Sequence, residues 1–227
     1  APTYEFDGVK YDPITISSLI LKRMKAYADA QGHDVKNVVI TCPAYFGNEE
    51  KAATRQAGII AGLNVLNIVH EPTAAALNYC VREFKENRKI MVYDLGGGTF
   101  DITLFDFSVD DSGKALIDVI KTGGNDRLGG IDWDARMFDY MCQKYAFENG
   151  TEVSNMDDEL RTTIRAQVEQ AKEDLSTLEK KSYTIKYDGD RTRIELTRKE
   201  FEELTQDLVQ QTMDFVHQLL SDVNFTP

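Results

Sequence analysis

The chain has 227 residues, with 26 Lys and Arg against 38 Asp and Glu, and a formal net charge of −12. Its 42% of apolar residues suffice for the core of one large domain or two lobes, which excludes a disordered chain. The acidic charge excludes a general nucleic-acid binder and a polybasic membrane-surface protein, because both need clustered Lys and Arg. No apolar stretch approaches the roughly 18 residues of a membrane span. We therefore expect a cytoplasmic protein without nucleic-acid or membrane partners.

The two ends and the cysteines set further expectations. The sequence starts at Ala1 without Met and stops at Pro227 directly after a helical pattern, so we expect a piece cut from a larger domain. Cys42, Cys80 and Cys142 are odd in number, widely spaced and form no CxxC pair. This pattern favours reduced side chains over a disulfide framework or a zinc site.

The first third of the chain has the pattern of alternating helices and strands. Helices are expected over 14–31, from an Asn48 cap to Gly62, and from Pro72 through Tyr79, and short apolar strands over 38–41 and 65–70. This order predicts an α/β layer with a parallel pair of strands. The first helix is amphipathic, with an apolar face formed by Ile16, Leu19, Ile20, Met24 and Tyr27.

The rest of the chain changes to strands and then to helices. After a polar stretch at 82–89, strands over 90–94, 100–107 and 115–122 predict an antiparallel meander, with a turn at 110–113. Helical patterns follow from Asp132 and over 157–178. A hairpin of 182–187 and 192–196 crosses the turn sequence DGDR. Thr197 and Glu200 form a capping box that opens a last helix, reaching about Ser221.

The clearest chemistry lies in Asp94-Leu95-Gly96-Gly97-Gly98-Thr99-Phe100-Asp101, between two strands. Three successive glycines let the backbone approach a ligand, their N–H groups can form an anion nest, and Thr99 adds a hydroxyl. The flanking carboxylates would repel a phosphate unless a cation lay between, and Mg²⁺ suits because it takes few direct protein ligands. A P-loop and a dinucleotide fingerprint both fail, since no Lys follows and the next element is a strand. The alternative is a glycine-rich hairpin turn.

Three further motifs have weaker meanings when taken singly. In Glu71-Pro72-Thr73-Ala74-Ala75-Ala76-Leu77, the Glu ends a strand and could orient a water or a metal-bound water. The alternative is a Glu that interacts with the helix dipole. Pro43-Ala44-Tyr45-Phe46 by itself predicts only a strand-to-helix turn. Gly123-Gly124 with Gly129-Gly130 predicts a tight crossing or a hinge.

In this order and spacing, PAYF, EPTAAAL, DLGGGTFD and LGG-x-D closely resemble the ATPase domain of the heat-shock protein 70 (DnaK-type) chaperones, over essentially the whole chain. The resemblance implies the actin-like, ribonuclease H-like α/β fold, with two lobes around a cleft for ATP or ADP with Mg²⁺. Residues 1–83 would form the C-terminal part of lobe IA and 84–127 the N-terminal part of lobe IIA. Residues 128–197 would form subdomain IIB, and 198–227 a helix returning to lobe IIA.

The resemblance also implies roles at the phosphate end of the site. The β- and γ-phosphates would be cradled by Gly96, Gly97, Gly98 and Thr99. Asp94 and Asp101 would hold hydrated Mg²⁺ and help place the attacking water, and Glu71 would lie near that water. Thr99 would stand beside the γ-phosphate. The four residues expected to be catalytic are Glu71, Asp94, Thr99 and Asp101.

Other matched positions concern the nucleoside and the signal between domains. Gly130 would contact the nucleotide, and the adenosine positions are Glu169, Lys172 and Ser176. Pro43 matches the proline that relays nucleotide state to a peptide-binding domain. The family usually has Arg eight residues later, where this chain has Lys51, which keeps the charge but not the planar fork.

The partners implied are a J-domain co-chaperone, a nucleotide-exchange factor, and unfolded polypeptide bound by a separate domain absent from this sequence. His70 stands where the family often has Asn, and Asn67 where it typically has a basic residue; J-domain proteins dock there in relatives. Ile131 replaces the first acid of LGGED, and Glu173 stands where some members stack an Arg on adenine.

Three functions remain open on the sequence. The first is an ATP-hydrolysing chaperone module, of which this piece alone would be inactive, because the first phosphate loop and the second adenosine loop would lie outside it. The second is a module that binds nucleotide or co-chaperones without turnover. The third is a small-molecule kinase of the same superfold, against which EPTAAAL counts.

Overall fold

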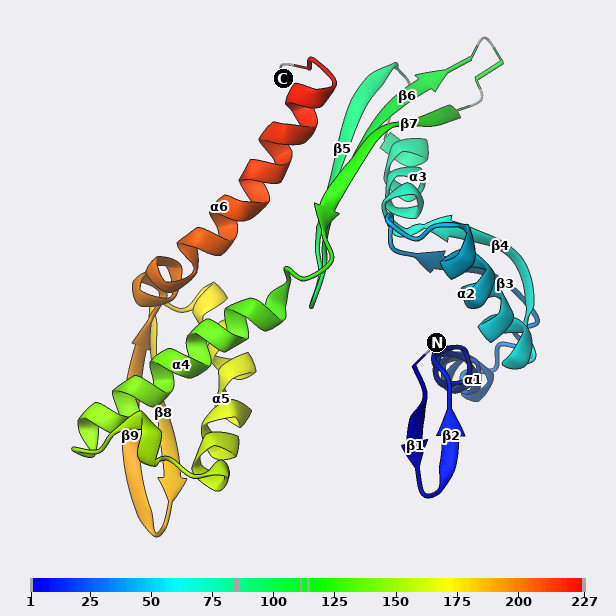
Figure 1. Ribbon diagram of the computed structural model, residues 1–227. Coiled ribbons are helices and arrows are strands. Elements are labelled where there is room, and N and C mark those ends of the chain that lie inside the picture. Colours follow the sequence, from blue (N-terminus) through cyan, green and yellow to red (C-terminus); the bar gives the residue numbers. More distant parts are fainter. Residues whose placement is uncertain (1, 84–85, 111, 114, 226–227) are drawn as a thin grey trace. The chain divides into compact units, whose positions relative to one another are not determined.

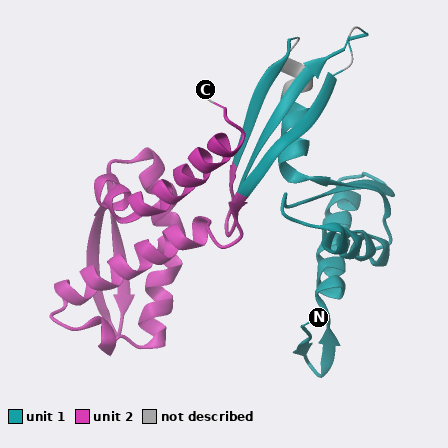
Figure 2. Ribbon diagram, turned by 45° about the horizontal axis from the view of Figure 1, so that its top comes forward, with its two compact units in different colours: residues 1–93, 101–123 teal, residues 94–100, 124–227 magenta. Residues whose placement is uncertain are grey.

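The structure, a computed structural model, describes residues 2–83, 86–110, 112–113 and 115–225. The chain forms two compact units (Figure 2). Unit 1 holds residues 1–93 and 101–123, and unit 2 holds residues 94–100 and 124–227. Both units mix helices with small sheets. In the ranges described, no helix is long and apolar enough to cross a membrane.

Unit 1 starts with a hairpin that the sequence analysis did not anticipate (Figure 1). In chain order its first elements are β1 (Tyr4–Phe6), β2 (Val9–Tyr11), α1 (Pro13–Ala30), β3 (Asn37–Cys42), α2 (Asn48–Ile60), β4 (Asn64–His70) and α3 (Glu71–Glu83). The hairpin turns at Asp7 and Gly8, whose φ values of 50° and 75° suit a two-residue turn. Strands β3 and β4 pair in parallel, which confirms the predicted α/β layer.

Helix α2 packs closely on the parallel pair because it carries a glycine at the contact. A Cβ at Gly58 would lie 2.5 Å from Val65 Cγ2 and 2.9 Å from Ile40 Cδ1, so these side chains would have to shift to admit it. Gly62 follows the helix with a φ of 81°, as its predicted place at the C-terminus requires. The prediction that Asn48 caps this helix is wrong. Gly47 is the N-cap, and its N–H donates to Glu50 Oε2 at 2.9 Å, so the glutamate takes over the capping.

Two other expectations for unit 1 need correction. Helix α3 continues to Glu83 instead of ending at Tyr79, because no glycine or proline interrupts it there. The side chains of 80–85, including Cys80, lie outside the described residues. The apolar face predicted for α1 is largely in solvent, since Ile20 is 58% and Met24 60% exposed.

A three-stranded sheet completes unit 1. It consists of β5 (Arg88–Leu95), β6 (Phe100–Val109) and β7 (Ala115–Asn125), in the order β5-β6-β7 expected of a meander. The arrows of β6 and β7 run in opposite directions (Figure 1). Phe105 and Phe107 are fully buried and form a cluster with Ala76 of α3. The alanine run of α3 therefore allows this helix to approach the sheet closely.

Unit 2 is built from three helices and a hairpin. Its elements are α4 (Gly130–Glu148), a short 3₁₀ turn (Val153–Asn155), α5 (Asp158–Thr177), β8 (Lys180–Tyr187), β9 (Asp190–Thr197) and α6 (Arg198–Asp222). The predicted stripe of α5 is entirely buried, and it comprises Leu160, Ile164, Val168, Ala171 and Leu175. It packs on Met141 of α4 and on Tyr183 and Ile194 of the hairpin. The capping box of Thr197 and Glu200 is formed as predicted.

Candidate functional site

The residues singled out in the sequence fall into two groups, one in each unit. Pro43, Lys51, Glu71 and Asp101 belong to unit 1. Unit 2 holds Asp94, Gly96, Gly97, Gly98, Thr99, Gly130, Glu169, Lys172 and Ser176.

In unit 2 the glycine loop is bonded to the start of α4. The Gly96 N–H donates to Thr99 O at 2.9 Å, which closes the loop between β5 and β6. The Gly130 N–H donates to Gly96 O at 2.9 Å, and the Ile131 N–H donates to Gly97 O at 2.8 Å. These bonds satisfy two N–H groups that the first turn of a helix leaves without partners. The first turn of α4 thus holds the loop in place.

Gly129 makes this contact possible. A Cβ on Gly129 would lie 2.4 Å from Gly98 N and 2.6 Å from the carbonyl carbon of Gly97. Real Cβ atoms do not approach backbone this closely, so no other residue fits. The sequence predicted that Gly129 and Gly130 belong to a tight crossing or a hinge. Their role in the structure is a close backbone approach, with the Gly129 N–H also bonded to Asp132 Oδ2 at 2.9 Å.

Three backbone donors of the glycine loop have no acceptor in the described part of the chain. Within the residues that the structure describes, the N–H groups of Gly97, Gly98 and Thr99 have no protein acceptor. A Cβ on Gly97 would meet nothing within 4 Å. None of the three loop glycines has a left-handed φ, so the alternating backbone of an anion nest, expected from the sequence, is not formed. The loop instead offers consecutive free donors beside open space.

Lys172 connects the predicted adenosine positions with this loop. Its Nζ lies 3.5 Å from Gly130 O and 2.7 Å from Asp134 Oδ1. The contact between Lys172 Nζ and Asp134 Oδ1 is an ion pair, but its geometry is not that of a hydrogen bond. Glu169 and Ser176 occupy the same exposed side of α5, at i−3 and i+4 from Lys172. The structure therefore places Lys172 against the first turn of α4, with its neighbours on the same helix face.

Asp134 belongs to none of the motifs recognised in the sequence. It lies one turn into α4 and pairs with Lys172, whose side chain is 28% exposed. A groove between α4 and α5, of about 470 Å³, is lined by Asp134 and Glu169, and by Phe138 with Arg165 stacked 4.6 Å above its ring. Asp134 lies in α4 and Lys172 in α5, so the two residues are far apart in the sequence. No local sequence pattern therefore predicts this ion pair.

In unit 1, Pro43 and Glu71 lie at one end of the parallel strands. Cys42 ends β3 and lies opposite His70, which ends β4. Pro43 and Glu71 follow directly, so the pairing brings their backbones to the same edge. Carboxyl ends of parallel strands are common ligand sites. Lys51 lies near enough to influence both Cys42 and His70.

The electrostatics of this edge follow from burial. Burial lowers the pKa of His70, and the charge of Lys51 lowers it further, so the ring is neutral at pH 7. Burial raises the pKa of the Cys42 thiol against the opposing effect of Lys51. Cys42 is 2% exposed, and it is a free thiol, as is Cys142. Asn67 is exposed, and its Oδ1 accepts from the Ile68 N–H.

The two aspartates beside the glycine loop differ in their surroundings. Asp94 is exposed at the end of β5, whereas Asp101 is 5% exposed and has an interaction partner. Across the described ranges, no three His, Cys, Asp or Glu side chains lie close enough to hold a metal ion by themselves. Carboxylates such as those of Asp94 and Asp101 are the kind of side chain that binds the waters of hydrated Mg²⁺.

Comparison with known proteins defines the family. A family model described as Hsp70 protein matches residues 3–227. The chain therefore belongs to the Hsp70 family, as the four motifs indicated. The family implies the actin-like ATPase fold, with which the mixed α/β units agree.

The chain is similar to several DnaK proteins that are longer than it is. The chain is 40% identical over 229 residues to the chaperone protein DnaK of Thermotoga petrophila and to that of Thermotoga maritima. It is 39% identical over 230 residues to the DnaK of Thermosipho melanesiensis. These alignments cover 97–98% of this chain and 37–38% of the relatives. The chain thus spans somewhat more than a third of their length.

Proposed function

We propose that the chain is part of an ATP-binding and ATP-hydrolysing module of a molecular chaperone. The observation that carries the proposal is the glycine loop, whose Gly97, Gly98 and Thr99 N–H groups have no acceptor among the described residues while hydrogen bonds from α4 hold the loop's carbonyls. Consecutive free backbone donors are suited to phosphate oxygens. The chaperone function rests on membership of the Hsp70 family and on similarity to DnaK proteins.

The chain's own residues would divide the work as follows. The loop amides and the Thr99 hydroxyl bind phosphate oxygens, and Lys172, Glu169 and Ser176 contact the nucleoside from α5. Hydrated Mg²⁺, when bound, neutralises phosphate charge, and Asp94 and Asp101 would hold its waters. Glu71 orients a water. We assign residues 1–83 to lobe IA, 84–127 to lobe IIA, 128–197 to subdomain IIB and 198–227 to the helix returning to lobe IIA.

The proposal extends to partners and place of action. Nucleotide state would be relayed through Pro43 and Lys51 to a separate domain that binds unfolded polypeptide. A J-domain co-chaperone would stimulate turnover, and a nucleotide-exchange factor would release ADP. His70 and Asn67 would help to decide which J-domain protein binds. The setting we propose is the cytoplasm.

Amide NMR titration tests the phosphate site directly. ATP with Mg²⁺ is added at millimolar concentration to the ¹⁵N-labelled 227-residue chain. We expect the Gly97, Gly98 and Thr99 amide signals to move, because their N–H groups would donate to phosphate oxygens. AMP, which lacks the β- and γ-phosphates, is the control and should leave them in place. Stationary loop signals with ATP, or equal movement with AMP, would contradict the site.

Calorimetry of ATP binding and assays of phosphate release distinguish an ATPase module from a module that binds nucleotide without turnover and from a kinase. We expect the chain alone to bind ATP weakly and not to hydrolyse it, so micromolar affinity would count against an incomplete site. In a protein of the relatives' length, nucleotide binding without phosphate release would favour a module without turnover. Phosphorylation of a sugar would favour a kinase.

A further inference from the structure

The outer face of the β8–β9 hairpin is cationic, although its surroundings in the sequence are acidic. Residues 128–227 hold 12 basic and 21 acidic side chains, a net charge of −9. In the antiparallel register Lys186 lies opposite Arg191, and Thr184 lies opposite Arg193. All four are exposed, whereas the positions between the two arginines and directly after them are buried. The cations therefore share one solvent-facing side of the hairpin.

These cations have no partner within the chain as described. Directly opposed like charges destabilise a strand pair, so the Lys186–Arg191 row is unfavourable unless an anion lies beside it. Among the described residues, no ion pair or side-chain hydrogen bond is found for Lys186, Arg191 or Arg193. The hairpin thus keeps three uncompensated cations on one face.

The neighbouring acids do not compensate them. Glu195 is on the same face, two residues from Arg193, but its carboxylate lies 3.7 Å from the ammonium of Lys180, toward the open end of the hairpin. Asp190 lies opposite Tyr187 and so belongs to the other face. Asp188 is in the turn, with a φ of 48°. An anion that binds this face would come from outside the hairpin.

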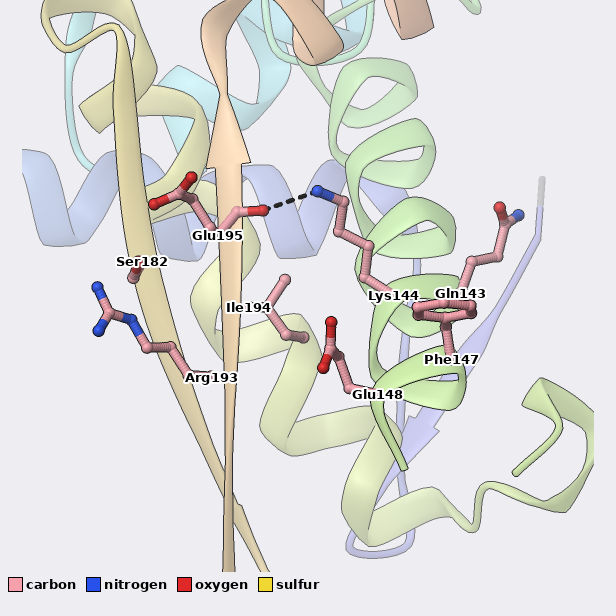
Figure 3. Close-up of a pocket in the computed structure, with 8 residues that line it drawn as sticks. All are labelled: Gln143, Lys144, Phe147, Glu148, Ser182, Arg193, Ile194 and Glu195. Carbon is pink, nitrogen blue, oxygen red and sulfur yellow. Dashed lines mark hydrogen bonds between the residues drawn. The ribbon is translucent and has the colours of Figure 1, made fainter. Parts of the chain in front are cut away.

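A groove adjoins the cationic face (Figure 3). It has a volume of about 630 Å³ and lies between α4 and β9, lined among others by Lys144, Phe147 and Arg193. Phe147 is 85% exposed, which leaves an apolar ring in water at the edge of the groove. Glu148 and Glu195 also line the groove, and Lys144 is paired with Glu200, so the uncompensated positive charge beside the apolar ring is that of Arg193.

The backbone of β9 also faces this groove. The Lys144 Nζ donates to Glu195 O at 2.8 Å, so this carbonyl points away from β8 (Figure 3). In an antiparallel ladder the N–H and C=O of a residue point to one side, and every second residue repeats it. Arg193 consequently directs its own N–H and C=O toward the groove. An extended segment can pair with such an edge.

We propose that this surface binds an acidic, extended segment of a partner protein. Carboxylates of the segment neutralise Lys186, Arg191 and Arg193, its main chain pairs with the edge of β9, and an apolar side chain covers Phe147. The acidic charge of the surrounding unit favours a short acidic segment over a nucleic acid, whose many phosphates it would repel.

Fluorescence anisotropy tests the proposal with a labelled peptide in which Glu and Leu alternate. We expect the 227-residue chain to bind it, more weakly as salt rises. Arg193→Glu should weaken binding roughly tenfold, since it replaces a charge-assisted contact with repulsion. Lys199→Glu makes the same charge change on α6, where the side chain is 84% exposed, and should bind like wild type. Circular dichroism confirms that both variants are folded.

Several outcomes would overturn the proposal. Equal weakening by Arg193→Glu and Lys199→Glu would show a response to net charge alone. Equal affinity for a peptide with Lys in place of Glu would show that the charge of the peptide does not determine binding. No binding of either peptide would show that this surface is not a binding site for an extended segment. Tighter binding of a single-stranded oligonucleotide would assign the face to nucleic acid. A dimer in analytical ultracentrifugation that Arg193→Glu dissociates would assign it to a second copy of the chain.

Discussion

Gly129 is the residue on which the attachment of the glycine loop depends. Gly129→Ala places a Cβ 2.4 Å from Gly98 N, so α4 and the loop must separate. We expect the free energy of unfolding to fall by about 1–3 kcal/mol, the usual cost of overpacking. Trp133 of α4, the single tryptophan, is 8% exposed, and its fluorescence follows the urea unfolding of this region.

Gly97→Ala is the matched control for this prediction. The added Cβ meets nothing within 4 Å, and Gly97 does not have a left-handed φ. Its free energy of unfolding should therefore stay within about 0.5 kcal/mol of wild type. A Gly129→Ala chain as stable as Gly97→Ala would contradict the close contact described for α4.

Thr99 and Glu71 are the residues whose substitution tests the proposed ATP hydrolysis. In a protein of the length of the DnaK relatives, Thr99→Ala or Glu71→Ala should lower ATP turnover at least roughly tenfold, the low end of the effect of one positioned catalytic group. Phosphate release at saturating ATP measures it. Thr163→Ala on α5, which removes a hydroxyl bonded to Glu159 O, is a control expected to keep turnover. Near-wild-type rates in both site variants would contradict the assignment.

For single residues, the sequence predicted which motifs are important, but it did not predict which atoms those residues contact. Gly96, Gly97 and Gly98 stood out because three glycines between strands are rare in ordinary turns. The reason for Gly129 could not be read from its neighbours, since the atoms it approaches lie about 30 residues earlier. The ion pair of Asp134 with Lys172 likewise joins two helices.

Among the elements, the junction of α4 and α6 depends on one carboxylate. Burial by itself would raise the pKa of Glu200, but hydrogen bonds from Lys144, Tyr140 and Thr197 outweigh it and lower the pKa to about 2. The distances are 2.6 Å from Lys144 Nζ and 2.6 Å from Tyr140 Oη to Glu200 Oε1. The ionised form of Glu200 therefore links α4 to the capping box of α6.

This carboxylate predicts a dependence of stability on pH. Because its pKa is lowered on folding, its contribution is present above about pH 4.5 and is lost as the pH falls toward 2. Glu200→Gln should lower the free energy of unfolding at pH 7 by about 1–2 kcal/mol, after allowance for a side chain 29% exposed. Near pH 2 the variant and wild type should converge.

Urea unfolding at pH 7 and at low pH measures this difference. Glu202→Gln is the control, since Glu202 is exposed on the same helix and makes none of these bonds in the described contacts. A Glu200→Gln deficit that persists unchanged at low pH would mean that shape, and not charge, holds the junction.

Helices α1 and α5 show what the spacing of apolar residues predicts about a helix and what it does not. Helices α1 and α5 both have apolar residues at helical spacing, and both formed close to their predicted bounds. The stripe of α5 is buried against α4 and the hairpin, whereas most of the predicted face of α1 is exposed. Periodicity predicts a helix and its apolar face, but it contains no information on what covers that face.

At the scale of the whole molecule, the exposed face of α1 is the largest departure from expectation. Leu19, Ile20, Met24 and Tyr27 are 48%, 58%, 60% and 56% exposed. Their spacing places them on one side of the helix, and the Arg23 guanidinium lies 4.7 Å from the centre of the Tyr27 ring. Exposed apolar surfaces bind apolar dyes and promote association.

We therefore predict that the 227-residue chain binds the dye ANS through α1. Ile20→Lys combined with Met24→Lys should reduce ANS fluorescence by about half, because it interrupts the apolar surface at its centre. The urea midpoint should change little, since both side chains are more than half exposed and Lys suits a helix. Phe147→Lys removes an apolar side chain of unit 2 that is 85% exposed, and it should leave the fluorescence unchanged. Equal loss of ANS signal in both variants would place the dye outside α1.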